Sequence, residues 1–396
     1  MKSWKAQSGD KYPLLYQWST VIGGLDFSRS IFLIYFSALG FSGTQTGWLQ
    51  AALFWTSFAL EIPSGIFADK FGRKISISGG FLLFALAHTV LATATTFTAA
   101  LVGFVFWGAA FAFLSGAASA LLYDGLKEAG RLDSHIHWLA RTRSIGTVAM
   151  GLAIMCGGVL YDIAPAAVFW ATAAAATLGL VLIQPVPEPR VHGSAPESPS
   201  TLKALGIYFG RPTGRNLLIF LAGMAAIEMA VTPFFIFSQN LFSQEGLSPT
   251  RVSLILGGGF LASSLAQSQA AKARSVPVGR LVAAGGLAIV LALSSFALVP
   301  AWPVQVALFA LLNVVPAFLY VHTDQYIQEH CESHIRASVL SVQSFANSVL
   351  VGFAYLGVGV VSDRLGLAVA LALLTVPVVF GLALVAGHFK RIESGR

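Results

Sequence analysis

Four ionisable residues stand inside stretches of sequence that are otherwise apolar, and they are the side chains best suited to do chemistry. Asp26 and Arg29 are three residues apart, so on a helix they would share one face. Glu228 and Glu61 each stand in a further apolar stretch. An ionisable group inside an apolar segment is costly unless it is paired or hydrated, so each is a candidate to bind a proton or a charged solute.

We predict Asp26, Glu228 and Glu61 as proton-coupling candidates. If Asp26 and Arg29 are functional, Asp26 takes up a proton or Arg29 contacts an anionic group. The alternative is that the two form a structural ion pair and neutralise each other. Glu228 has no basic neighbour in sequence and precedes Pro233, which loosens a helix. Its alternative is a hydrogen bond to a hydroxyl or to the backbone. Glu61 could equally brace the loop that follows it.

Composition defines the environment of these residues. The chain has 396 residues, of which 56% are hydrophobic and only 10% charged, and its mean hydropathy is +0.75. A soluble domain has about 25% charged residues. A soluble globule, a disordered chain and a disulfide-stapled secreted fold are therefore excluded. The two cysteines, Cys156 and Cys331, show no metal-ligand spacing, and there is no phosphate-binding loop, so we expect no metal, no cofactor and no enzyme.

The apolar runs are long enough to be membrane-spanning helices, each of which needs about 20 residues. They are too continuous for the strands of a membrane barrel. The predicted spans lie near 14–38, 45–68, 75–95, 98–123, 138–161, 166–185, 214–238, 251–271, 280–299, 303–326, 337–361 and 367–388. We therefore expect an all-α integral membrane protein with twelve transmembrane helices.

Basic residues are distributed asymmetrically across these spans. With the N-terminus inside, every Lys and Arg except Arg29, Arg251 and Arg364 falls in an internal loop or at the inner end of a helix. This bias predicts cytoplasmic termini in a bacterial-type inner membrane. It also explains the net charge of +7 without nucleic acid, since no basic run alternates with exposed aromatic residues.

The chain divides into two similar halves. A segment rich in Pro, Ser and Glu predicts a cytoplasmic linker at 191–212, between an N-terminal six-helix bundle at 1–190 and a C-terminal six-helix bundle at 213–396. Short matches recur at nearly one offset: GGVLYD at 157–162 with VGVVSD at 358–363, Asp124 with Asp324, and Ser-His-Ile at 134–136 and 333–335. Tandem halves of one orientation are typical of alternating-access transporters.

One loop carries a recognisable signature, formed by Gly65, Asp69, Lys70, Gly72, Arg73 and Lys74 between the second and third spans. This loop resembles the signature of the major facilitator superfamily. Physically, Gly65 would let two helices approach closely and Gly72 would permit a tight turn. The resemblance implies two six-helix bundles with pseudo-two-fold symmetry around a central cavity, working as a monomer. It also implies that Asp69 pairs with the loop arginine and faces the start of span eleven.

Other signatures of the superfamily are weak. The loop of the second half is degenerate, span four lacks the Arg-x-x-Gln-Gly of many proton-coupled members, and span five lacks the Gly-Pro pair of the drug antiporters. The sequence around the signature loop nevertheless resembles a bacterial branch of the superfamily that has many exporters. At the inner helix ends we predict gate clamps, Asp124 with Arg141 and Arg143, and Asp324 with Arg336; the alternative is ordinary interfacial charge.

The predicted cavity residues combine aromatic and neutral polar side chains with one cation. An aromatic-rich cavity suits a planar or amphipathic ligand, although many aromatic residues must simply face lipid. His88 and His322 are further candidates to bind a proton, although an isolated histidine is more often a hydrogen-bonded wall residue. The predicted set is Arg29, Tyr35, Trp55, Phe58, Phe234, His322, Asn313, Gln343 and Asn347.

The leading interpretation is a secondary active transporter that couples proton entry to the efflux of an amphipathic metabolite or drug. Its partners are then the small-molecule substrate, protons and the lipid bilayer. The alternatives are proton-coupled uptake of an anionic metabolite or a siderophore-like metal chelate, flipping of a lipid-like molecule, and a non-transporting membrane sensor.

Overall fold

The computed structural model describes residue 4 and residues 10–189, 201–299, 301–332 and 335–394. Every regular element in this part of the chain is a helix, which confirms the predicted all-α class. Lys2, Lys5, Arg190, the first ten residues of the predicted linker and the second Ser-His repeat lie outside the described residues.

Most predicted spans coincide with one continuous helix, because a long apolar run satisfies its backbone only inside itself. These helices are α3 (Gly43–Phe71), α4 (Arg73–Thr93), α5 (Phe97–Glu128), α6 (His135–Ile163), α7 (Ala167–Ile183), α9 (Pro212–Gln244), α10 (Pro249–Gln269), α11 (Val278–Leu298), α12 (Trp302–His330) and α13 (Arg336–Leu365). The last span divides into α14 (Leu367–Leu373) and α15 (Thr375–Ser394). Short elements lie between them: η2 (Leu132–Ser134), α8 (Thr201–Gly210) and η3 (Ala270–Ala273).

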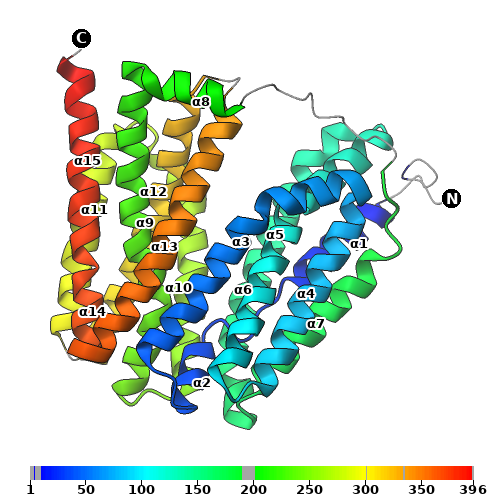
Figure 1. Ribbon diagram of the computed structural model, residues 1–396, viewed down its shortest axis with the longest axis horizontal. Coiled ribbons are helices and arrows are strands. Elements are labelled where there is room, and N and C mark those ends of the chain that lie inside the picture. Colours follow the sequence, from blue (N-terminus) through cyan, green and yellow to red (C-terminus); the bar gives the residue numbers. More distant parts are fainter. Residues whose placement is uncertain (1–3, 5–9, 190–200, 300, 333–334, 395–396) are drawn as a thin grey trace. The chain divides into compact units, whose positions relative to one another are not determined.

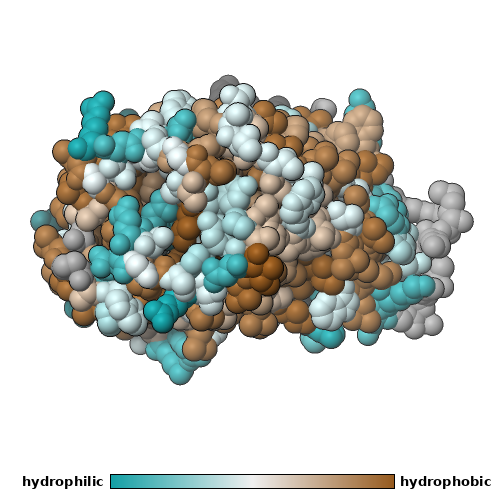
Figure 2. Space-filling view, turned by 90° about the horizontal axis from the view of Figure 1, so that it is seen from below, coloured by the Kyte–Doolittle hydropathy of each residue, from teal (hydrophilic) through white to brown (hydrophobic). Residues whose placement is uncertain are grey.

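Nine helical segments in the described residues are long and apolar enough to cross a membrane. The sixth predicted span, α7, has 17 residues, and the eighth, α10, is not among the nine. The outer surface agrees with a lipid environment. Ile62, Ile163 and Phe380 are between 60% and 77% exposed, and hydrophobic side chains cover much of the face seen in Figure 2. The chain is therefore a multi-pass membrane protein.

The first predicted span is broken, which corrects the expected helix over 14–38. Helix α1 (Lys11–Gly23) ends at a pair of glycines and α2 begins only at Phe32, so α2 covers Phe32–Ala38. Asp26 and Arg29 lie in the non-helical segment 24–31, and the prediction that they share a helix face is wrong. The cause is local: glycine is a weak helix former, and Asp26 Oδ1 accepts the backbone N–H of Ser28 at 3.0 Å, which competes with helix formation.

The described residues divide into two compact units. Unit 1 comprises those within Met1–Phe41, Trp48–Ala195 and Ser248–Gly257, and unit 2 comprises those within Ser42–Gly47, Pro196–Leu247 and Gly258–Arg396. In unit 1, α4 packs against α5 and α7, and α1 packs against α6 and α7 (Figure 1). A buried cluster that includes Tyr16, Phe81 and Trp138 fills the space among these helices.

Unit 2 is built around α9, which packs against α12, α13 and α15 (Figure 1). Helix α11 packs against α12 and α15. Phe234 of α9 lies edge-on to Phe296 of α11, with ring centroids 4.8 Å apart. Internal prolines interrupt the hydrogen bonding of α9 at Pro233 and of α12 at Pro316.

In each unit the aspartate at the end of the repeated hexapeptide contacts the start of another helix. In unit 1, Asp162 near the end of α6 accepts the hydroxyl of Thr250 at the start of α10, 2.5 Å away. In unit 2, Asp363 near the end of α13 accepts the backbone N–H groups of Gly43 and Thr44 at the start of α3, at 2.7 and 2.8 Å. Four residues before each aspartate a glycine contacts the backbone of the same helix start, where a Cβ would overlap it: Gly158 and Gly359. The repeat thus marks a carboxylate that binds the first turn of another helix.

Candidate functional site

The signature loop is a tight turn held by a carboxylate from elsewhere in the chain. Gly72 has φ of +109°, a conformation that favours glycine, and α4 starts at the next residue. The two carboxylate oxygens of Glu188, just beyond α7, accept the backbone N–H groups of Arg73 and Lys74 at 2.7 and 2.8 Å. A carboxylate at a helix N-terminus satisfies donors that have no partner inside the helix. Glu188 could not be identified from the sequence, because it is 114 residues from Lys74.

Arg73 forms an ion pair with Asp124 of α5, and its guanidinium also donates to the Ala120 carbonyl at 2.7 Å. Two predictions are corrected by this arrangement. The partner of Asp124 is Arg73, whereas Arg141 lies over the ring of Trp138, 5.3 Å from its centroid, and Arg143 is exposed on α6. The loop arginine accordingly pairs with Asp124 and not with Asp69.

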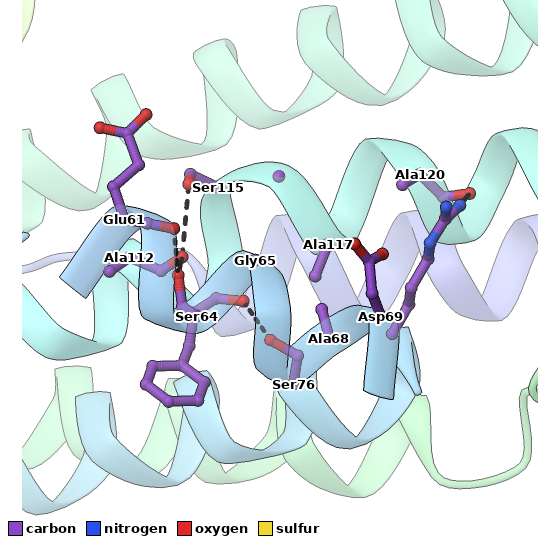
Figure 3. Close-up of a pocket in the computed structure, with 13 residues that line it drawn as sticks. Glu61, Ser64, Gly65, Ala68, Asp69, Ser76, Ala112, Ser115, Ala117 and Ala120 are labelled. Atoms are coloured by element: carbon purple, nitrogen blue, oxygen red, sulfur yellow. Dashed lines mark hydrogen bonds between the residues drawn. The ribbon is translucent and has the colours of Figure 1, made fainter. Parts of the chain in front are cut away.

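A cavity of about 240 Å³ adjoins this loop in unit 1. Small side chains of α3, α4 and α5 form its walls, and Glu61 and Asp69 lie toward its two ends (Figure 3). The hydroxyl of Ser64 donates to the Ala112 carbonyl at 2.9 Å and thereby ties α3 to α5. Gly65 lines this cavity, and a Cβ there would meet no described atom within 4 Å. The predicted close helix approach at Gly65 is therefore wrong in this structure.

Asp26 belongs to unit 1 and is buried, with 3% of its surface exposed. Its Oδ1 accepts the hydroxyl of Ser28 at 2.6 Å and lies 3.9 Å from Nε2 of His88 on α4. His88 has no exposed surface. The sequence placed Asp26 in an apolar region but did not bring His88 to it, since the two are 62 residues apart. Arg29 is half-buried in the same non-helical segment.

Glu228 lines a second, smaller pocket, of about 30 Å³, inside unit 2. The pocket gathers three predicted residues from two helices, Glu228 on α9 and Gln343 and Asn347 on α13. Glu228 accepts the Thr232 hydroxyl at 3.0 Å, one helical turn further on. Asn347 has a side-chain oxygen that is buried without a hydrogen-bond partner among the described residues. Apolar groups of α9 and α12 complete the walls, together with Thr323 and the exposed Tyr320.

Other predicted polar residues make local contacts. Asp324 accepts the side-chain amide of Gln328 at 2.7 Å on its own helix, and the described residues show no ion pair between Asp324 and Arg336. Asn313 donates to the Phe309 carbonyl at 2.8 Å. His322 is buried against the ring of Phe318, with centroids 4.9 Å apart.

The predicted aromatic residues divide between core and partly exposed positions. Tyr35 packs edge-on to Phe169 inside unit 1, and Phe234 is 1% exposed inside unit 2. Trp55 and Phe58 on α3 are partly exposed. Among the described residues no three His, Cys, Asp or Glu side chains are grouped as a metal site would need. The arrangement offers carboxylates, amides and hydroxyls for hydrogen bonding and proton exchange.

Comparison with known proteins defines the family. The sequence profile of the Major Facilitator Superfamily matches residues 19–355. No curated protein matches the sequence. The fold is similar to that of the nucleoside transporter NupG, with a TM-score of 0.75 and 15% identity over 97% of this chain and 98% of that chain. It is also similar to a bacterial homologue of the human lysosomal transporter Spinster in its inward-facing, unoccupied conformation, with a TM-score of 0.80 and 15% identity over 100% and 99% of the two chains. With its apolar helices and its signature loop, this chain belongs to the Major Facilitator Superfamily of membrane transporters.

Proposed function

We propose that the protein is a proton-coupled exporter of small amphipathic organic solutes that works by alternating access. It acts as a monomer in a bacterial-type inner membrane, with both termini in the cytoplasm. The basic residues at one set of helix ends support that orientation. The exporter-like sequence around the signature loop supports the direction.

One observation carries the proton coupling: each unit holds a carboxylate within its helices whose hydrogen bond comes from a neutral hydroxyl. Asp26 accepts from Ser28 in unit 1, and Glu228 accepts from Thr232 in unit 2. Asp26 is 3% exposed, whereas the Glu228 side chain is exposed but lies midway along the apolar helix α9, so in each case proton uptake removes a charge that is costly inside a membrane. The free energy of each unit therefore depends on its proton, and a bound proton can favour one conformation over another.

The unit 2 pocket supports the class of solute. Its polar atoms include the Glu228 carboxylate and the side-chain amides of Gln343 and Asn347, beside the apolar Ile227 and Leu319. A carboxylate accepts hydrogen bonds and attracts cations. We therefore propose that the pocket receives an amine or another donor group, while the apolar body of the solute lies outside this small pocket.

The test is solute-induced proton movement. The protein is reconstituted in vesicles of known orientation with a pH-sensitive dye in the lumen, and a panel of amphipathic cations, zwitterions and anionic chelates is added outside. Proton movement opposite to solute movement is the result expected for an exporter.

Proton movement in the same direction as the solute would replace export with uptake and would direct attention to Arg29 as an anion contact. Solute movement without proton movement would overturn the proposed coupling. The vesicles should also contain the variant Asp133→Asn as a control, because Asp133 is an exposed carboxylate in η2 with no place in the site.

A further inference from the structure

The non-helical segment 24–31 is held firmly inside unit 1, although helices surround it. The Phe27 amide donates to the hydroxyl of Thr172 on α7 at 3.0 Å. The Ser30 hydroxyl donates to the Ile154 carbonyl on α6 at 2.9 Å. Gly157 leaves room for the segment, since a Cβ there would overlap the Phe27 carbonyl oxygen. The segment that carries Asp26 is therefore held by contacts to two other helices, α6 and α7.

His88 faces Asp26 with a ring nitrogen that has no hydrogen-bond partner among the described residues. Its other ring nitrogen, Nδ1, lies 2.9 Å from the Phe84 carbonyl oxygen. A carbonyl oxygen can only accept, so Nδ1 carries a hydrogen and Nε2 is a bare acceptor when the ring is neutral. Nε2 is buried and has no hydrogen-bond partner among the described residues, and Asp26 Oδ1 lies 3.9 Å from it.

The two facing atoms are both acceptors when no extra proton is present. A carboxylate oxygen and a bare imidazole nitrogen repel each other, and 3.9 Å is longer than a hydrogen bond of about 2.7–3.2 Å. One added proton resolves the conflict, whether it resides on oxygen or on nitrogen, and allows the two atoms to close to hydrogen-bonding distance. The net charge of the pair then changes from −1 to 0.

Aromatic rings surround the His88 side of this pair. The rings of Phe84 and Trp107 lie 4.4 and 4.7 Å from the His88 ring, and Phe169 lies 6.3 Å away. Helix α7 has no ionisable residue in its described span. The charged residues of α4 are at its start, Arg73 and Lys74, about 20 Å from His88 along the helix axis.

The remaining neighbours carry their charges at a distance or on the same segment. Helix α5 has its ionisable residues in its last turns, from Tyr123 onward, and α1 has Lys11, Tyr12 and Tyr16. Helix α6 has histidines and arginines up to Arg143, the exposed Cys156, and Tyr161 and Asp162 near its end, and it contacts the segment at Ile154 and Gly157. Arg29, three residues after Asp26, is the nearest cation in sequence.

We propose that His88 and Asp26 together form the proton-binding site of unit 1, with one proton shared between Nε2 and Oδ1. This inference rests on the proposed function, because it names the second residue of the proton coupling. Binding of the proton adds a hydrogen bond between α4 and the segment that carries Arg29, and release of the proton removes that bond. A proton taken up on one side of the membrane and released on the other completes one transport cycle.

The first experiment needs no solute. The Trp107 ring reports on His88, since a positive charge beside an indole ring perturbs it. The fluorescence of Trp107, taken as the wild type minus Trp107→Phe, is followed in detergent between about pH 5 and pH 9. We expect one titration step that is absent in His88→Gln and absent or displaced in Asp26→Asn. A step that persists unchanged in His88→Gln would overturn the proposal.

The second experiment separates coupling from structure. With a gradient of one pH unit, one coupled proton supports about a tenfold solute gradient. In His88→Gln we expect this gradient to be lost while solute exchange at equal pH persists, and we expect Asp26→Asn with His88→Gln to lose no more than either variant alone. His137→Gln, at an exposed position near the start of α6, is the control. Loss of exchange together with the gradient would mean that His88 is structural.

The two experiments also distinguish this inference from the proposed function. A fluorescence step that depends on His88, without any solute-linked proton movement, would retain the proton site but contradict proton-coupled transport. Proton-coupled transport that is unchanged in His88→Gln would retain the proposed function and overturn the shared site.

Discussion

Asp363 binds the first turn of α3 through two backbone amides, Gly43 at 2.7 Å and Thr44 at 2.8 Å. The aspartate at the equivalent place in the other half of the sequence, Asp162, accepts the Thr250 hydroxyl. Both aspartates follow by four residues a glycine that touches the same helix start. A pattern that repeats at one offset in the sequence thus repeats as a contact.

Replacement of Asp363 by asparagine should weaken this helix cap. Asparagine keeps one acceptor oxygen but turns an NH2 group toward the second backbone donor. Loss of a capping interaction costs about 1 kcal/mol, so the thermal midpoint in detergent should fall. Arg364→Gln changes the charge of the next, exposed residue and should leave the midpoint unchanged. Equal effects of the two changes would show that charge and not capping is responsible.

Two glycines of the signature loop should respond oppositely to alanine. Gly72→Ala places a Cβ at a residue with φ of +109° and 3.0 Å from the Glu188 carboxylate carbon, which should cost about 1–2 kcal/mol. Gly65→Ala meets no described atom within 4 Å and gains helix propensity, so it should raise stability by up to about 1 kcal/mol. Thermal midpoints of the two variants provide the comparison. A loss of stability in Gly65→Ala would mean that a close approach at this glycine does exist.

Arg73 and Asp124 should be energetically coupled. Their side chains are 21% and 11% exposed, and Arg73 also binds the Ala120 carbonyl. A double-mutant cycle with Arg73→Ala and Asp124→Ala should give a coupling free energy of about 1–2 kcal/mol. The matched control is the pair Arg131 and Asp10, which is 40% and 52% exposed and should give less than about 1 kcal/mol. Equal coupling in both pairs would contradict a structural role for the buried pair.

Asn347 should affect solute affinity more than proton movement. Its side-chain oxygen is buried in the unit 2 pocket without a partner, so a solute donor group can supply the missing hydrogen bond. Loss of that bond in Asn347→Ala should raise KM by about tenfold for an amine-bearing solute. The proton-to-solute ratio should remain that of the wild type. Gln325→Ala, at an exposed position on α12, is the control. A changed proton-to-solute ratio with unchanged KM would show that Asn347 acts in proton coupling and not in solute binding.

The sequence was sufficient for the helices wherever an apolar run was continuous. A bilayer fixes the length of a spanning helix, and α3, α5 and α9 follow from that constraint alone. The break between Gly23 and Phe32 was not predicted, because the apolar pattern continues on both sides of it. Two adjacent glycines followed by Asp26 and Ser28 were the available signal, since these side chains bind backbone groups in place of helix formation.

The site was less predictable than the helices, because its contacts join residues distant in sequence. The sequence singled out Glu228, Gln343 and Asn347 as candidates, and the structure brings these three residues to one pocket. It did not predict that Arg73 pairs with Asp124, or that Glu188 holds the signature loop. Both depend on how α4, α5 and the end of α7 pack, and periodicity does not determine such packing.

Proton coupling as proposed requires a carboxylate in each unit, and Glu228 is the one in unit 2. The direct measurement is solute accumulation in vesicles of one orientation under imposed pH gradients, with wild type, Glu228→Gln and the control Glu329→Gln. Glu329 is an exposed carboxylate near the C-terminal end of α12 and does not line the pocket.

For wild type and Glu329→Gln, we predict that the solute accumulates only when the lumen is more acidic than the outside solution, so that protons leave as solute enters. For Glu228→Gln, the same gradient should drive no accumulation, while exchange of labelled for unlabelled solute at equal pH persists. Accumulation by Glu228→Gln that still follows the pH gradient would contradict the central role of this carboxylate, and accumulation by wild type that ignores the gradient would contradict proton coupling altogether.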